Sequence, residues 1–349
     1  FLQLNGRFEE SLSSEILEHQ KLISKSEAIL NIHFPQTQKL LSLSQFRLKF
    51  EELFYIQLQL ILKNIIHKSK IKGYRFETVG DYFNTFYNKH LPFELTNAQK
   101  RVLKEIRIDM GSNAQMNRLL QGDVGSGKTI VALMSMFIAI DNDFQSTLMA
   151  PTEILAFQHY NGLKPFCDAI GVTIALLTGS SKTAARRVIH ENLESGALQI
   201  IVGTHALLED KVKFKNLGLA IIDEQHRFGV AQRSKLWKKN ACPPHILVMT
   251  ATPIPRTLAM SVYGDLDISV IDELPAGRKP IKTVHRYDTN RLKVIGFIRD
   301  EIAKGRQIYI VYPLINESET LDFKDLMDGY EGIVRDFPMP KYQVSMVHG

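Results

Sequence analysis

A glycine-rich stretch in the first half of the chain has the residue types and spacing of a phosphate-binding loop. Gly122 and Gly127-Lys128-Thr129 fit the pattern G-x-x-x-x-G-K-[ST], and the apolar run 130–140 follows directly, so the loop should open a helix. Glycine lets backbone N–H groups approach a phosphate, while the Lys128 ammonium adds charge and the Thr129 hydroxyl can ligate Mg²⁺. The alternative is a glycine-rich turn before a buried helix. We expect a nucleoside triphosphate to contact Gly122, Asp123, Val124, Gly125, Ser126, Gly127, Lys128 and Thr129.

An acidic pair follows an apolar stretch about 100 residues later. Residues 219–222 predict a buried strand, and Asp223 and Glu224 come directly after it. Asp223 is expected to hold Mg²⁺, directly or through water, and Glu224 to orient and polarise the attacking water, with His226 close to the γ-phosphate. Alternatively, the pair caps a following helix, but a triphosphate loop without an acidic partner would leave Mg²⁺ unheld. The predicted catalytic residues are Lys128, Asp223, Glu224 and His226, and the predicted metal ligands are Thr129 and Asp223.

Gln99 admits two interpretations. Thr96 and Gln99 form a T-x-x-Q capping box in front of a helical pattern through Val102, Leu103 and Ile106. Because an amide carries both a donor and an acceptor, Gln99 could instead present itself to an adenine edge. The nearby phosphate-binding loop favours adenine recognition.

The elements that must position these residues are short apolar strands. Continuous apolar strands alternating with helical patterns are typical of a parallel sheet covered on both faces. Ligands bind at the carboxyl ends of the strands in such a doubly wound α/β fold, so the polar residues after each strand should line one edge together with Lys128. The predicted strands are 147–150, 173–177, 200–202, 219–222 and 246–249.

Composition restricts the class of protein. A chain of 349 residues with 44% hydrophobic and 23% charged residues is typical of a globular protein of two or three domains. The net charge of +6 weakly favours a polyanionic partner. Cys167 and Cys242 have no CxxC spacing, which argues against a disulfide framework or a zinc site. The run 130–140 is shorter than the roughly 20 residues that span a bilayer, so we expect a cytoplasmic protein without a membrane partner.

The N-terminal region is expected to be helical. Apolar residues recur at spacings of three and four over residues 37–69, which predicts a long helix with a broad buried side. Its end, residues 61–75, contains no acidic residue and could lie along phosphates, although a solvated helix end is the favoured interpretation. Both ends of the chain are expected to be cut from a longer protein.

The order of these motifs resembles that of superfamily 2 helicases. More narrowly, residues 222–230, 249–259, 263–267 and 271–278 resemble the RecG family of branch-migration helicases. The transcription-repair coupling translocases are the nearest rival family, but they usually carry Asp-Glu-Glu-His where this chain has Gln225. The segments of the wider resemblance are Gln99, the loop, 150–152, 203–205, 223–226 and 250–252.

The resemblance implies a RecA-like motor with a doubly wound parallel sheet. A first RecA-like domain would occupy residues 91–280, after the end of a wedge domain and a helical linker over 1–90. A truncated second RecA-like domain would start at 281, with its first strand at residues 308–315. The implied activity is that of an ATP hydrolase acting on DNA, a helicase that remodels stalled forks and Holliday junctions in recombination and repair. Alternatives are a transcription-repair coupling translocase and a nucleotide-dependent switch that does not translocate.

Several strand-end residues are expected to contact the phosphates of DNA without reading bases or to couple DNA to the nucleotide. They are Thr152, Thr204, His205, Thr250, Thr252 and Arg256. For Thr204 and His205, the alternative is a helix cap with a packed imidazole. The expected cofactors are ATP and Mg²⁺, and the expected partners are branched or forked DNA and a single-stranded-DNA-binding protein, with the protein itself monomeric.

Catalysis in such motors relies on an arginine from the second domain that reaches the γ-phosphate. None of the arginines of residues 283–349 lies in a segment that resembles the late arginine motif implied by the resemblance. We therefore expect this chain to bind Mg²⁺-ATP through Lys128, Thr129 and Asp223 but to hydrolyse it slowly. The arginines in question are Arg286, Arg291, Arg299, Arg306 and Arg335.

Overall fold

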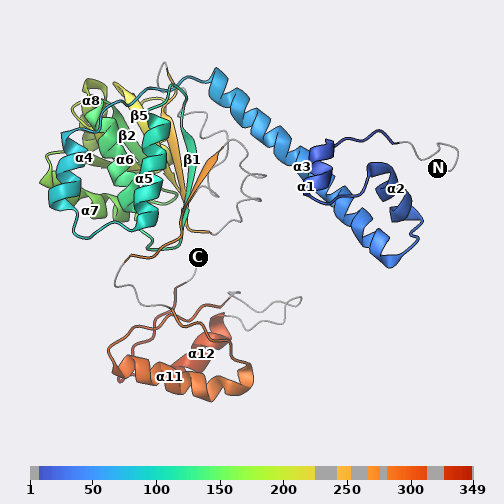
Figure 1. The fold of residues 1–349 in the computed structure, drawn as a ribbon. Coiled ribbons are helices and arrows are strands. Elements are labelled where there is room, and N and C mark those ends of the chain that lie inside the picture. Colours follow the sequence, from blue (N-terminus) through green and yellow to red (C-terminus); the bar gives the residue numbers. More distant parts are fainter. Residues whose placement is uncertain (1–7, 225–241, 253–265, 276–280, 313–325, 348–349) are drawn as a thin grey trace. The chain divides into compact units, whose positions relative to one another are not determined.

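The computed structural model describes residues 8–224, 242–252, 266–275, 281–312 and 326–347 (Figure 1). The chain divides into two compact units, Phe1–Arg278 and Lys279–Gly349. The first contains three N-terminal helices and an α/β domain. The described part of the second contains one short 3-10 helix and two α-helices.

A seven-stranded parallel sheet forms the centre of the α/β domain, with the strand order β3-β4-β2-β5-β6-β1-β7. All five predicted strands are confirmed. The sheet also contains two strands that were not predicted. They are β1, which leads into the phosphate-binding loop, and β7, which lies at one edge of the sheet. The strands are β1 (Asn117–Gly122), β2 (Gln145–Met149), β3 (Ile174–Leu177), β4 (Ile200–Gly203), β5 (Leu217–Asp223), β6 (His245–Thr250) and β7 (Asp267–Ile271).

Helices cover both faces of this sheet, as the continuous apolar strands predicted. Successive strand residues point to opposite faces, so Leu120 and Ile221 join one core cluster while Leu119 and Ile222 join the other. The first cluster includes side chains of α5 and α6, which Figure 1 shows against the sheet, and the second includes Leu193 of α8. The helices in the described part of this domain are α4 (Asp81–Thr85), the π-helix η2 (Phe86–His90), α5 (Asn97–Met110), α6 (Lys128–Asp141), α7 (Glu153–Ala169), α8 (Thr183–Ser195) and the 3-10 helix η3 (His205–Leu208).

Two cysteines lie in or beside this domain, and both are free thiols. Burial raises the pKa of Cys167 to about 12, so this residue stays protonated at neutral pH.

The segment between the N-terminal helices and α4 is hydrogen-bonded to residues near the amino-terminal ends of the strands. Lys72 forms an antiparallel bridge with Ala114, and the Phe76 N–H donates to the carbonyl of Met110 over 2.8 Å. His245, at the start of β6, is buried between this segment and the residues that lead into β1. Its Nδ1 accepts the N–H of Met116 over 2.9 Å, so Nε2 carries the proton and donates to the Tyr74 carbonyl over 2.7 Å.

The N-terminal helices are α1 (Ser14–His19), α2 (Lys25–His33) and α3 (Gln38–Lys70). The predicted long helix is confirmed by α3, but its broad buried side is not. Phe46, Leu53 and Ile65 are 54%, 62% and 59% exposed, because α2 packs along only part of a helix that is 33 residues long. Within the described residues, no helix combines the length and apolarity that crossing a bilayer requires.

The second unit is helical in its described part, with the 3-10 helix η5 (Asp288–Asn290), α11 (Arg291–Ala303) and α12 (Leu326–Asp336). The predicted strand over 308–315 is wrong for residues 308–312, which are neither helix nor strand. A strand requires a neighbour to complete its backbone hydrogen bonds, and the described residues of this unit supply none. Residues 313–315 lie outside the described part.

Candidate nucleotide-binding and catalytic site

The loop between β1 and α6 has the backbone of a phosphate cradle. Gly125 and Gly127 have φ angles of 76° and 88°, in the left-handed region that favours glycine. A Cβ on Gly127 would lie 2.2 Å from Nε2 of Gln99, so a larger residue would clash as well as strain the backbone. Helix α6 starts directly after Gly127 without a side-chain cap. Its N-terminal N–H groups and the positive end of its dipole therefore suit an anion.

Lys128, the first residue of α6, lies at the mouth of this loop. Its ammonium donates to the carbonyls of Gly122 and Asp123 over 2.7 and 3.0 Å. Burial lowers the pKa of Lys128, while the charges of Asp223, Glu224 and Asp123 act in the opposite direction. Both acidic residues thus lie close enough to this amine to influence its pKa.

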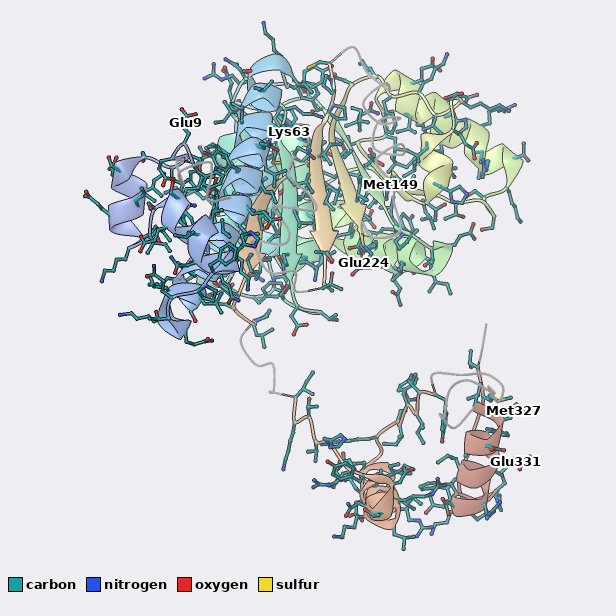
Figure 2. The ribbon with its side chains drawn as sticks, turned by 90° about the vertical axis from the view of Figure 1, so that its right-hand side faces the viewer. Glu9, Lys63, Met149, Glu224, Met327 and Glu331 are labelled. Carbon is teal, nitrogen blue, oxygen red and sulfur yellow. The ribbon has the colours of Figure 1, made fainter. Side chains whose placement is uncertain are left out.

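The sheet brings the acidic pair to the loop. Strand β6 lies between β1 and β5, so the carboxyl ends of β1 and β5 are two strand spacings apart, about 10 Å. Asp223 is the last residue of β5 and pairs with Met249 of β6. Figure 2 shows Glu224 at the same end of the strands.

Glu224 has an unusual backbone, with a φ of 51°. This left-handed conformation costs about 1 kcal/mol or more in a residue other than glycine. Its N–H donates to the Met249 carbonyl over 2.9 Å, and its Oε1 accepts the N–H of Ala251 over 3.4 Å. The carboxylate is thus held between the ends of β5 and β6.

Among the described residues, His159 of α7 contacts Asp223, a contact that the sequence patterns did not predict. Its Nε2 lies 2.7 Å from Oδ2 of Asp223, and both side chains are 13% exposed. The available signal was position: a histidine in the second turn of a helix that begins at the ligand edge of the sheet. That signal alone does not indicate which strand end the side chain reaches.

Gln99 forms the capping box and also contacts the loop. Its backbone N–H donates to Thr96 Oγ1 over 3.2 Å, and its Oε1 accepts the N–H of Thr96 over 2.9 Å, which confirms the box. The remaining donor, Nε2, binds the Ser126 carbonyl over 2.8 Å. The side chain is 1% exposed, and its adenine contact stays a prediction.

The predicted DNA-contacting residues that the structure describes follow strands at the same edge. Thr152 is the N-cap of α7 and accepts the N–H of Leu155 over 3.3 Å. Thr204 is the N-cap of η3 without a side-chain cap bond and is 1% exposed, whereas His205 is exposed. The hydroxyls of Thr250 and Thr252 lie 2.7 Å apart. His226, Gln225 and Arg256 lie outside the described residues.

Sequence comparison relates the chain to known helicases. The DEAD/DEAH box helicase family model matches residues 96–261. The ATP-dependent DNA helicase RecG of Synechocystis sp. is 46% identical over 344 residues, which cover 99% of this chain and 41% of that protein. RecG of Bacillus subtilis is 45% identical over 338 residues, 97% of this chain and 49% of that protein.

A solved structure of a RecG protein is similar to this chain in fold as well as in sequence. The RecG protein in the structure of RecG bound to a three-way DNA junction has a TM-score of 0.74 and 39% identity, over 95% of this chain and 43% of that one. The chain spans about half the length of the relatives it matches. Their similarity extends over nearly the whole of this chain, including the N-terminal helices, and the RecA-like sheet and loop are those of a helicase motor. The chain therefore belongs to the RecG family of helicases.

Proposed function

We propose that this chain carries the ATP-hydrolysing part of a DNA helicase that remodels branched DNA, such as stalled forks and Holliday junctions, in recombination and repair. The observation that carries the proposal is that Lys128 and the pair Asp223 and Glu224 share one sheet edge. The relatives support the substrate, since they are named ATP-dependent DNA helicases and one was solved with a three-way junction.

We assign distinct roles to the residues of the site. Lys128 would bind the β- and γ-phosphates, and Glu224 would orient the attacking water and accept its proton. Thr129 and Asp223 would hold Mg²⁺, which neutralises charge on the phosphate oxygens when bound. The described residues contain no group of three or more His, Cys, Asp or Glu side chains suited to a metal. Mg²⁺ usually takes one or two carboxylates together with phosphates and waters.

The DNA contacts in this proposal are contacts to the backbone. His205 and the N-terminus of α7 at Thr152 would bind phosphates, and Thr204, which is buried, would couple that contact to the nucleotide. Thr250, Thr252 and Arg256 complete the proposed set. We also place the protein in the cytoplasm as a monomer that meets a single-stranded-DNA-binding protein at its substrate.

Substitution of the loop lysine tests the nucleotide site. Lys128→Ala in the full-length protein is expected to reduce ATP turnover by at least 10²-fold, because the phosphates lose their point charge in the ground and transition states. Steady-state ATPase measures this. Lys164→Ala, which changes an exposed lysine of α7 paired with Asp168, is the control and should leave turnover unchanged. Near-normal turnover in Lys128→Ala would refute the site.

A second measurement separates a helicase from a nucleotide-dependent switch. ATPase of the full-length protein is measured without DNA, with linear duplex and with a model fork. A translocase that remodels branched DNA should be stimulated most by the fork. Equal ATPase under the three conditions would favour the switch.

A further inference from the structure

The contact between His159 and Asp223 joins α7 to the end of β5, across 64 residues of sequence. An ionised carboxylate can only accept hydrogen bonds, so Nε2 of His159 must carry a hydrogen, and this N–H donates a hydrogen bond to Oδ2. One carboxylate oxygen of Asp223 is thereby engaged by a protein donor. The other oxygen, Oδ1, does not take part in this hydrogen bond and can still bind a metal ion through both of its lone pairs.

Helix α7 does not need this bond to stay in position. Its N-terminus is capped by Thr152, and its inner face is packed through Ala156, Leu163 and Cys167, which are at most 1% exposed. The backbone of Asp223 is likewise fixed by its pairing with Met249 of β6. What the imidazole adds is control over the side-chain orientation of Asp223.

We propose that His159 is a positioning residue for Asp223, which holds one carboxylate oxygen so that the other is directed to Mg²⁺. The inference rests on the proposed role of Asp223 as the metal ligand. Ligating carboxylates are commonly oriented by hydrogen-bonding partners outside the ligand set, and loss of such a partner typically lowers metal affinity or activity 10- to 100-fold.

The test measures metal-dependent nucleotide binding rather than turnover. A fluorescent ATP analogue is titrated onto the full-length protein in EDTA and then at increasing Mg²⁺ concentration. His159→Ala is expected to raise the half-saturating Mg²⁺ concentration about 10-fold or more. Nucleotide affinity in EDTA should not change, because the loop around Lys128 is intact.

Two further variants separate positioning from a general structural effect. His159→Gln should restore most of the Mg²⁺ response, since the Nε2 of glutamine is a donor of similar reach. Asn161→Ala is the matched control: it is exposed and lies about 200° around α7 from His159, so it should behave like the unsubstituted protein. Thermal unfolding of each variant reports on stability.

Three results would overturn the inference. They are an unchanged Mg²⁺ response in His159→Ala, an equal loss of affinity in EDTA and in Mg²⁺, and failure of a stably folded His159→Gln protein to restore the response. Asp223→Ala separates this failure from that of the proposed function. If Asp223→Ala shifts the Mg²⁺ response and His159→Ala does not, only the role of His159 is wrong. If neither variant shifts it, the metal assignment itself fails.

Discussion

Glu224 follows Asp223 by one residue, yet the two carboxylates are held in different ways. Asp223 ends a strand and receives the hydrogen bond of His159, whereas Glu224 has left the strand in a left-handed conformation and accepts from the N–H of Ala251. Strained backbone of this kind concentrates at functional sites. The difference in environment supports a difference in role.

The two roles predict different mutant phenotypes. Asp223→Ala should weaken Mg²⁺-dependent nucleotide binding about 10-fold or more, since a proposed metal ligand is lost. Glu224→Gln should leave binding nearly unchanged and slow hydrolysis by about 10²-fold or more, since only the acceptor for the water proton is lost. Binding of a fluorescent nucleotide and single-turnover hydrolysis measure the two effects. Equal loss of binding in both variants would contradict the division of roles.

His245 makes stability depend on pH. Burial lowers the pKa of His245 from its ordinary 6.5 to about 4, although its bond to the Tyr74 carbonyl acts in the opposite direction. The unfolded chain therefore binds the proton more readily than the folded chain between these values. Above pH 6.5 both states are neutral, and the stability contributed by neutral His245 is lost as the pH falls from 6.5 towards 4. The upper bound of this loss is about 3 kcal/mol.

Substitution of His245 should remove this dependence. His245→Gln retains an acceptor and a donor for Met116 and Tyr74 but does not titrate, so its thermal midpoint should fall less between pH 6.5 and 4. His19→Gln, at an exposed position of α1, is the control and should keep the original slope. A slope in His245→Gln equal to that of the control would show that other groups cause the acid sensitivity.

At the scale of the elements, a buried ion-pair network joins the N-terminal residues to α3. The Arg47 side chain is fully buried and donates to Glu10 over 2.5 Å and to Glu51 over 2.6 Å. Lys25 of α2 also binds Glu51, over 3.0 Å. These ion pairs hold α2 and the segment before α1 against the same part of α3.

Loss of Arg47 should therefore loosen the whole N-terminal element. Arg47→Ala removes the buried cation that joins Glu10 to Glu51 and should destabilise the element by up to about 3 kcal/mol, while Arg47→Met should cost less because it fills the space. Hydrogen exchange of α1 and α2 measures the opening. Lys49→Ala, on the exposed side of α3, is the control. Unchanged exchange in Arg47→Ala would show that apolar packing alone holds these helices.

At the scale of the whole molecule, Arg291, Arg299 and Arg306, three of the five arginines described in the second unit, have side-chain or ring partners within that unit. Arg291 pairs with Asp336 over 3.1 Å, Arg299 donates to the Asp336 carbonyl and lies over the Phe337 ring, and Arg306 pairs with Glu301. Each would have to leave its partner to approach a γ-phosphate.

The 349-residue chain is consequently expected to bind Mg²⁺-ATP and to hydrolyse it about 10³-fold more slowly than the full-length protein, with little stimulation by DNA. Arginine fingers contribute about 10³ to 10⁵ in rate where they act. Steady-state ATPase of both proteins, with and without a model fork, is the measurement. Comparable turnover would rule out a catalytic arginine outside this chain.

Local patterns in the sequence were sufficient to predict much of the motor. The glycine spacing, the apolar strands and the capping box of Thr96 and Gln99 depend on residues close together in the chain, so their physical causes are visible there. The same patterns predicted that Asp223 and Glu224 come directly after a buried strand, and the structure includes Asp223 as its last residue. They also predicted α3, because its apolar spacing is helical.

Only the tertiary structure decided what lies against these elements. Helical spacing fixes the apolar residues of α3 but not whether a partner covers them, and many stay exposed. An apolar run such as 308–312 becomes a strand only beside another strand. Gln99 reaches Ser126 across 27 residues, and His159 reaches Asp223 across 64. Such contacts follow from strand order and crossovers, which bring distant residues together and which no local pattern encodes.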